Sequence, residues 1–329
     1  MTEAEPKAYP NPHLRQDLLE YGLLALAVVL VGVFVDNPYY LQLLVFIGIN
    51  TLLALGLNML MGYAGQISLG HAAFYGIGAY TTAILTANYG FSPWLALPCA
   101  VGLAALVALL VGLPTLKLSG YYLGMGTLGF GMIGFIVFRE WDGITGGASG
   151  FVGIPSLSLG PLDLTAGANY LYLVWAIVLL SIMVCRRLIR SRMGRALRAI
   201  HDSEDAARAV GVHTMALKLR IFIFSAALAA LCGFLYAHYV TFISPGSFDF
   251  LASIRMVTMV VIGGMASVWG ALLGAGLLTM LPEWLHAFSD FEMIVYGLIM
   301  MVVMILMPQG LTRGLLDLYQ RVRRGHGRK

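Results

Sequence analysis

The chain is 329 residues long; 59% of its residues are hydrophobic and only 11% are charged, with a formal net charge of +4. Because a soluble domain carries about 25% charged residues, so little charge cannot cover a water-soluble globule. The composition excludes a soluble enzyme, a nucleic-acid-binding protein and a disordered chain, and it identifies an integral membrane protein.

Apolar runs long enough to cross a membrane recur along the whole chain. A helix needs about 20 apolar residues to cross the hydrocarbon core. The predicted runs are residues 18–35, 39–61, 69–87, 94–113, 121–138, 169–186, 219–241, 251–281 and 291–307. No sustained alternation of polar and apolar residues favours a membrane β-barrel, so strands are not expected. The predicted fold class is all-α, a polytopic membrane protein with about 8–10 transmembrane helices, including an interrupted or re-entrant pair.

The positions of the basic residues predict the orientation of the chain, because lysine and arginine accumulate in cytoplasmic loops. If the N-terminus is cytoplasmic and the first six runs cross in alternation, all but two of the 20 lysines and arginines lie inside. The exceptions are Arg139 and Arg255. We therefore predict a cytoplasmic N-terminal segment (1–17), a transmembrane domain (18–307) with a cytoplasmic loop (187–218), and a basic cytoplasmic tail (308–329).

The run at residues 251–281 is too long for one straight crossing. Its 31 residues would form a helix about 46 Å long, against a hydrocarbon core of about 30 Å. Gly263, Gly264 and Gly270 interrupt the run, and a single crossing would place the basic tail outside. We predict two short segments that meet between residues 263 and 269 and that enter from outside and return there. One strongly tilted helix is the alternative.

Residues 56–71 combine four glycines with polar side chains at the junction of two runs. Glycines permit close helix approach or an unwound backbone, and neutral amides and hydroxyls offer hydrogen bonds. Together with the glycines of the interrupted run, these polar residues are candidates for lining a translocation path. The alternative is that they hold helices together. The polar candidates are Asn58, Gln66, Ser68 and His71.

Glycine and proline punctuate residues 143–168, which indicates an external loop rather than a crossing. Thr145, Gly146 and Gly147 open the glycine-rich part of this loop. A long ordered loop outside the membrane suits a gate or a docking surface for an external partner. A plain connector is the alternative.

The internal loop between Arg186 and Arg220 contains a narrow stripe of small apolar residues at helical spacing, namely Ala196, Ile200, Ala207 and Val210. Ser203 is suited to capping a second short helix, and Gly211 to ending it. The small stripe and the mixed charge favour docking into a groove on another protein. A cationic helix lying on anionic lipid headgroups is the alternative.

The sequence contains no pattern typical of covalent chemistry. There is no G-x-x-x-x-G-K-[ST] phosphate cradle, no H-E-x-x-H and no metal-spaced His/Cys cluster. Ser68 and His71 lack an orienting third group, which makes them a poor nucleophile and base. The three cysteines lie in apolar runs and suggest neither a disulfide nor redox chemistry. We therefore expect no enzyme activity, and no metal or cofactor in this chain.

Four segments of the chain resemble permease subunits of branched-chain amino acid ABC importers of the LivM type. They are residues 56–71, 145–155, 194–211 and 244–274, within a similarity that runs from about residue 40 to residue 311. Asp205, Ala206 and Ala207 followed by Gly211 are similar to the E-A-A-x-x-x-G coupling motif of such importers, with aspartate in place of glutamate.

The resemblance implies a complex with a homologous second permease subunit and two ATP-binding cassette ATPase subunits, which bind the ATP. An external substrate-binding protein would deliver leucine, isoleucine or valine, although relatives carry urea, short amides or other amino acids. It also implies a bacterial inner-membrane location with both termini cytoplasmic. Residues 194–211 would dock into an ATPase, with Ile200, Ala206 and Ala207 filling a groove. Gly194, Arg195, Arg198, Asp205 and Gly211 complete this coupling set.

Two other classes of protein remain open from the residues alone. A secondary transporter would need ionisable groups inside the membrane to bind a coupling ion. No carboxylate lies in the interior of any predicted run, and the ionisable candidates are His71, together with His238 and Arg255 near run ends. A structural or receptor-like membrane protein would not need interrupted crossings.

Overall fold

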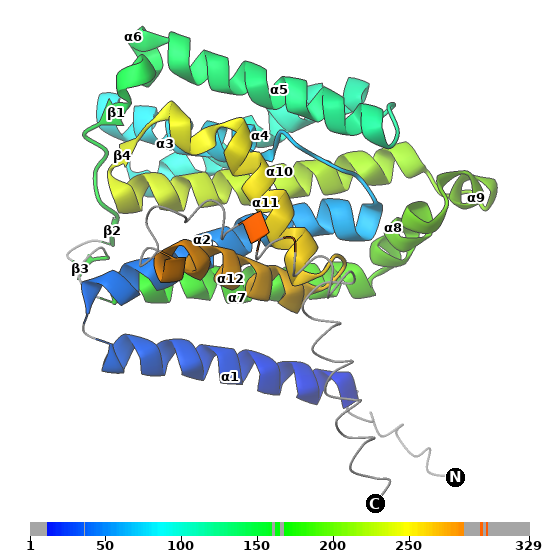
Figure 1. The fold of residues 1–329 in the computed structure, drawn as a ribbon, viewed down its shortest axis with the longest axis horizontal. Coiled ribbons are helices and arrows are strands. Elements are labelled where there is room, and N and C mark those ends of the chain that lie inside the picture. The colour runs from blue at the N-terminus through cyan, green and yellow to red at the C-terminus, as the bar shows by residue number, and fades with distance from the viewer. Residues whose placement is uncertain are drawn as a thin grey trace, which may run out of the picture.

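The computed structural model describes residues 12–35, 37–159, 162–164, 168–285, 297, 298 and 301. Long helices run side by side along the molecule, with α1 and α5 at opposite edges (Figure 1). The α-helices are α1 (Pro12–Phe34), α2 (Pro38–Asn58), α3 (His71–Ala83), α4 (Pro93–Thr115), α5 (Tyr121–Glu140), α6 (Asp142–Thr145), α7 (Asn169–Arg190), α8 (Arg192–Asp202), α9 (Glu204–Ala209), α10 (Thr214–Val240), α11 (Phe250–Gly263) and α12 (Val268–Leu285).

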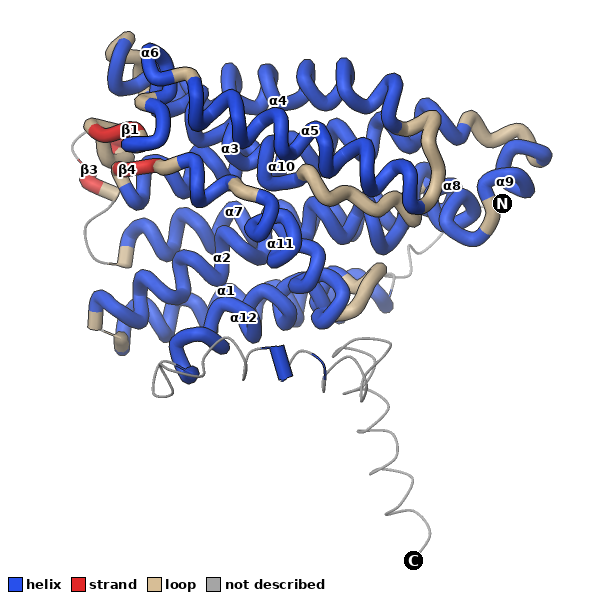
Figure 2. Tube along the Cα trace, turned by 45° about the horizontal axis from the view of Figure 1, so that its top comes forward, coloured by secondary structure: helices blue, strands red, loops and turns tan. Residues whose placement is uncertain are grey.

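Short elements extend or join these helices. The π-helical turns η1 (Met59–Tyr63) and η2 (Ile84–Asn88) continue α2 and α3, and the 3-10 turns are η3 (Gly147–Ser149) and η4 (Pro245–Phe248). The strands, of two residues each, are β1 (Phe151–Val152), β2 (Ser158–Leu159), β3 (Leu162–Asp163) and β4 (Phe242–Ile243). β1 pairs antiparallel with β4, and β2 with β3. All four strands lie at the end of the molecule opposite α8 and α9 (Figure 2).

Six helices among the described residues are long and apolar enough to cross a membrane. They are Pro38–Tyr63, Pro93–Thr115, Tyr121–Glu140, Asn169–Arg190, Thr214–Val240 and Pro245–Gly263. The protein is therefore a multi-pass α-helical membrane protein, and the predicted fold class is confirmed. The expectation of no strands is wrong, because the loops at one end pair over two residues. The predicted run at residues 291–307 and the tail at 308–329 lie outside the described residues, apart from single positions.

Helices α3, α4 and α10 pack closely because small residues face one another. A Cβ on Gly78 would overlap the backbone of Ala230, and one on Gly233 would overlap the carbonyl of Tyr75. Small interfacial residues of this kind let membrane helices approach at backbone distance. On α4, one fully buried stripe repeats every four residues and consists of Ala96, Ala100, Ala104, Ala108 and Gly112.

The predicted interruption of the run at residues 251–281 is present. Helix α11 ends at Gly263, helix α12 begins at Val268, and a Cβ on Gly263 or Gly274 would overlap a backbone carbonyl of the facing helix. The two helices therefore fold back on each other as a tight hairpin. A single tilted helix is excluded. Gly270 lies in the same contact: a Cβ placed on it would lie 2.7 Å from the Gly263 carbonyl oxygen.

Candidate functional site

Helix α3 starts at His71 rather than at the predicted residue 69, because residues 65–70 are not helical. We call these residues the 65–70 segment. Gly65 has a left-handed backbone (φ +67°), which ends the preceding helix. At the other end the N–H of Leu69 donates to Thr127 Oγ1 on α5 (3.0 Å), and the N–H of Ala72 donates to Ser253 Oγ on α11 (3.0 Å). The segment is thus held between α5 and α11.

Three of the predicted path residues are buried in or next to the 65–70 segment. Gln66 is 3% exposed, and Ser68 and His71 are each 1% exposed. Among the residues that the structure describes, the Gln66 amide, the Ser68 hydroxyl and His71 Nδ1 have no hydrogen-bond partner. His71 Nε2 lies 3.3 Å from Ser225 Oγ. Leaving a buried polar atom unpaired costs about 1–3 kcal/mol, so these atoms carry unused hydrogen-bonding capacity inside the bundle.

The fourth polar candidate, Asn58, does something different. Its Nδ2 donates to the Ser267 carbonyl (2.7 Å) and its Oδ1 accepts from the Ala266 N–H (2.9 Å). The Tyr63 hydroxyl donates to the Ala266 carbonyl (2.6 Å). Ala266 and Gly264 both have positive φ, at 58° and 112°. Asn58 and Tyr63 therefore fasten the turn between α11 and α12 to α2, which is a packing role.

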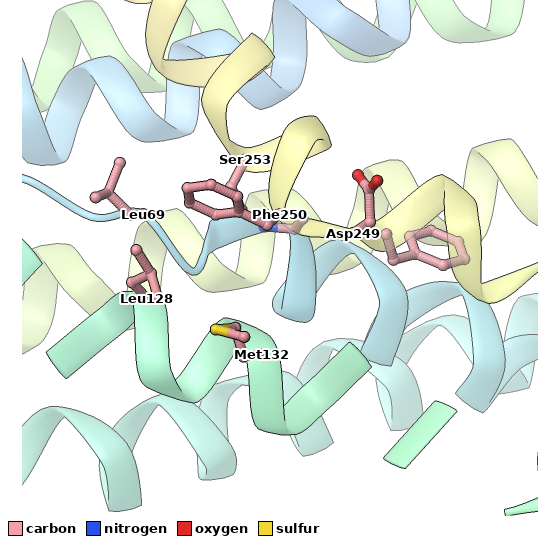
Figure 3. A pocket seen from close by; sticks show the side chains of 9 residues that line it. Leu69, Leu128, Met132, Asp249, Phe250 and Ser253 are labelled. Carbon is pink, nitrogen blue, oxygen red and sulfur yellow. The ribbon is translucent and has the colours of Figure 1, made fainter. Parts of the chain in front are cut away.

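A pocket lies where the 65–70 segment meets α5 and α11 (Figure 3). Its lining residues are Leu69, Ala72, Leu128, Gly131, Met132, Phe248, Asp249, Phe250 and Ser253. Asp249 caps α11, since its Oδ1 accepts from the Ala252 N–H (2.8 Å). The pocket walls come from three elements far apart in the chain, so a shift of any one of them changes its shape.

At the opposite end from the strands, α8 and α9 project beyond the bundle (Figure 1). Ser191 caps α8, and Ser203 caps α9 as the sequence predicts, its Oγ accepting from the Ala206 N–H (3.3 Å). Gly211 (φ +83°) follows α9, as predicted. A Cβ on Gly194 would overlap the Ile189 carbonyl, so α8 can fold back closely on the end of α7.

The predicted apolar stripe of this loop is divided between two faces. Ile200 and Ala207 are buried within the chain, Ala207 at 2% exposure, whereas Ala206 is exposed and Val210 is 79% exposed. In this arrangement Ile200 and Ala207 pack within their own chain, and Ala206 is the exposed member of the three residues predicted to fill a groove on a partner. The physical reason is that α8 and α9 pack this side against α7 and α10. The outward face contains Arg195, Arg198, Asp205, Ala206, Val210 and Gly211.

An ionic contact that the sequence did not reveal ties α9 to α10. Glu204 accepts hydrogen bonds from Lys218 and from Arg208 (2.8 Å). Lys218 is buried, so without Glu204 its charge would be left inside the protein without this partner. Burial raises the pKa of Glu204, but the hydrogen bonds from Lys218, Thr214 and Arg208 outweigh it and hold the pKa below its usual value.

A second missed cluster surrounds Arg186 at the same end of the bundle. Its guanidinium lies 2.7 Å from Asp17 and 2.5 Å from Glu20, and it stacks over the rings of Tyr21 and Trp269. Trp269 Nε1 also donates to Glu20 (3.1 Å). The cluster joins α1, α7 and the start of α12.

The predicted external loop is ordered where the structure describes it. Thr145 is buried, and its hydroxyl lies 2.8 Å from the carbonyls of Phe138 and Trp141. Gly146 and Gly147 both have positive φ. Phe151 pairs with Ile243 in the β1–β4 ladder, which attaches the loop to the end of α10.

Broken helices, a tight hairpin and buried unpaired polar groups within a multi-pass bundle define a membrane transport protein. The chain belongs to the family of permease components of branched-chain amino acid transport systems, which matches residues 39–307. This transport family also agrees with the prediction that the chain is not an enzyme.

Curated relatives give the same assignment. The chain is 36% identical to the high-affinity branched-chain amino acid transport system permease protein LivM of Escherichia coli over 91% of this chain and 75% of that protein. It is 37% identical to LivM of Salmonella typhimurium over 80% of this chain and 67% of that protein. The corresponding LivH protein of Escherichia coli is 26% identical over 79% of this chain and 90% of that protein. No solved structure matches the chain.

Proposed function

We propose that this protein is the permease subunit of an ATP-driven importer for leucine, isoleucine and valine in a bacterial inner membrane. The relatives' names and the family support the substrate class. Its partners are a homologous second permease, two ATP-binding cassette ATPases that bind the ATP, and an external binding protein. Similarity to both LivM and LivH supports the paired permeases. Residues 18–307 form the transmembrane domain, and the termini (1–17 and 308–329) are cytoplasmic.

The observation that carries the ATP-driven mechanism is the projecting pair α8–α9. It lies at the end of the bundle that holds Arg186, Arg187, Arg190, Arg192, Arg195 and Arg198, which the positive-inside rule makes cytoplasmic. Its outward face offers Ala206 and Val210 surrounded by charged residues, an apolar centre with a polar rim as in protein interfaces. This face docks into an ATPase subunit.

Gln66 and Ser68 line the translocation path beside the 65–70 segment. Their buried and unpaired atoms can exchange hydrogen bonds with the ammonium and carboxylate of a passing amino acid. A neutral lining holds a zwitterion weakly enough to release it. At the other end of the bundle, the loop containing Thr145, Gly146 and Gly147 receives the binding protein, because the β1–β4 ladder fixes this loop to α10.

Reconstitution of the four-subunit complex in proteoliposomes tests the proposal. Leucine uptake should require ATPase subunits that face the inside of the vesicle, ATP in the same compartment, and the binding protein outside. Unlabelled isoleucine and valine should compete with leucine, whereas urea and short amides should not. Uptake driven by an ion gradient without ATPases would instead establish a secondary transporter, and competition by urea or amides alone would change the substrate class.

A further inference from the structure

Helix α8 touches the 65–70 segment directly. A Cβ placed on Gly65 would lie 2.9 Å from His201 Nδ1 and 3.5 Å from His201 Cα. His201 is exposed and stands in the last turn of α8. Gly65 also has a positive φ of 67°, so glycine is favoured here by both space and backbone. The projecting helix and the interrupted membrane helix therefore meet at one compact contact.

The far end of the same segment controls the pocket wall. A Cβ on Gly70 would overlap the Thr127 carbonyl of α5, and Leu69 both bonds to Thr127 and lines the pocket. Ser253 of α11, which bonds to Ala72, lines the pocket as well. Gln66 and Ser68 lie between the two ends, so a displacement that enters at Gly65 passes both before it reaches the pocket.

A second set of contacts ties the α8–α9 pair to the helices of the bundle. Glu204 fixes α9 to Lys218 of α10, and α10 meets α3 at backbone distance through Gly233 and Gly78. These contacts join α9, α10 and α3 into one packed unit. The 65–70 segment, which is not helical, is the part that can change shape when α8 moves relative to that unit.

We infer that Gly65 and His201 form the contact through which movement of α8 reaches the translocation path. They are positioning residues for transport: His201 displaces Gly65, and the 65–70 segment carries the displacement to the pocket between α3, α5 and α11. This inference rests on the proposed function, because it takes α8–α9 as the element that the ATPases move.

The test uses the complete reconstituted complex and measures leucine transported per ATP hydrolysed, together with ATPase subunits retained on purification. The variants are Gly65→Ala, His201→Ala, the double variant and Gly90→Ala. Gly90 is the matched control, since its φ is +65° but a Cβ there meets nothing within 4 Å. Gly65→Ala should lower leucine per ATP by about fivefold or more, as expected for the loss of a coupling contact, while the ATPases stay bound.

His201→Ala alone should also lower leucine per ATP, because the contact is lost. The double variant should recover part of the Gly65→Ala defect, since removal of the ring gives the new methyl group room. The inference is overturned if Gly65→Ala behaves like Gly90→Ala, if His201→Ala leaves leucine per ATP unchanged, or if the double variant shows no recovery. A wild-type complex that takes up no leucine with ATP would instead overturn the proposed function itself.

Discussion

Asn58 accepts a 2.9 Å hydrogen bond from the backbone N–H of Ala266, a residue 208 positions later in the chain. The same side chain donates to the next carbonyl, that of Ser267. One side-chain amide thus pairs with both a backbone donor and a backbone acceptor of the turn. In a membrane protein, an unpaired backbone group is costly. Asn58 therefore ties the turn between α11 and α12 to α2, next to the Tyr63 hydroxyl that bonds the Ala266 carbonyl.

Asn58→Ala should therefore destabilise the protein strongly. It leaves the Ala266 N–H and the Ser267 carbonyl, both in part-buried bonds, without this partner, which costs about 1–3 kcal/mol in all. Asn50→Ala is the matched control, because Asn50 makes one half-buried bond to the Thr279 hydroxyl, worth about 0.6 kcal/mol. Unfolding free energies in mixed micelles measure both. Equal losses in the two variants would contradict the anchoring role of Asn58.

Val210→Glu should release the ATPase subunits without harming the permease itself. The side chain is 79% exposed, so the unfolding free energy should change by no more than about 0.5 kcal/mol. A desolvated charge at the centre of the docking face should weaken ATPase binding by about 2 kcal/mol or more. Co-purification of the ATPases measures this. Val152→Glu, a similarly exposed position among the strands, is the control and should retain them.

Ala207→Glu should behave in the opposite way. Because Ala207 is buried against its own chain, the glutamate has to displace α9, and the permease itself loses about 2 kcal/mol or more of stability. Thermal unfolding of the isolated permease checks this result. An unchanged unfolding midpoint together with lost ATPase binding would show that Ala207 contacts the ATPase and not its own chain.

Glu204→Gln should loosen α9 in a way that depends on pH. The folded state lowers the pKa of Glu204, so its contribution to stability is present above the ordinary value of 4.5 and is lost as the pH falls through the lowered pKa. The difference in unfolding free energy between wild type and variant should be about 1 kcal/mol near pH 7 and should vanish at acidic pH. A difference that stays constant from pH 7 to below pH 4.5 would contradict the ionic link. Asp205→Asn, an exposed neighbour, is the control.

Arg186→Lys should weaken the joint between α1, α7 and α12. A lysine cannot contact both carboxylates of Asp17 and Glu20 while stacking on Tyr21 and Trp269, so we expect a loss of about 1–2 kcal/mol. Arg187→Lys keeps the charge at the adjacent exposed position and should change little. Thermal unfolding of the two variants measures this difference. Identical midpoints would show that Arg186 contributes only its positive charge and not its two-carboxylate and ring contacts.

The sequence was sufficient for features that depend on local chemistry. Glycines predicted the break after Gly263, and Ser203 and Gly211 predicted the limits of α9. The glycines before His71 were compatible with an unwound backbone but did not decide between it and close helix packing. Helical periodicity could not tell whether Ala207 packs on its own chain or on a partner, because a small apolar stripe serves both. The contacts of Arg186 and Glu204 join residues distant in sequence, and strands of two residues leave no pattern to detect.

Helix α1 has a consequence for how the protein is made. Its main packing partner is α7, and helices α2 to α5 are all synthesised between them. At about 5–20 residues per second, α1 waits several seconds with its leucine-rich surface unpaired before α7 arrives. A nascent chain stalled after α5 therefore carries α1 without its packing partner. Gly32 receives the Tyr172 ring of α7 only after α7 has been synthesised.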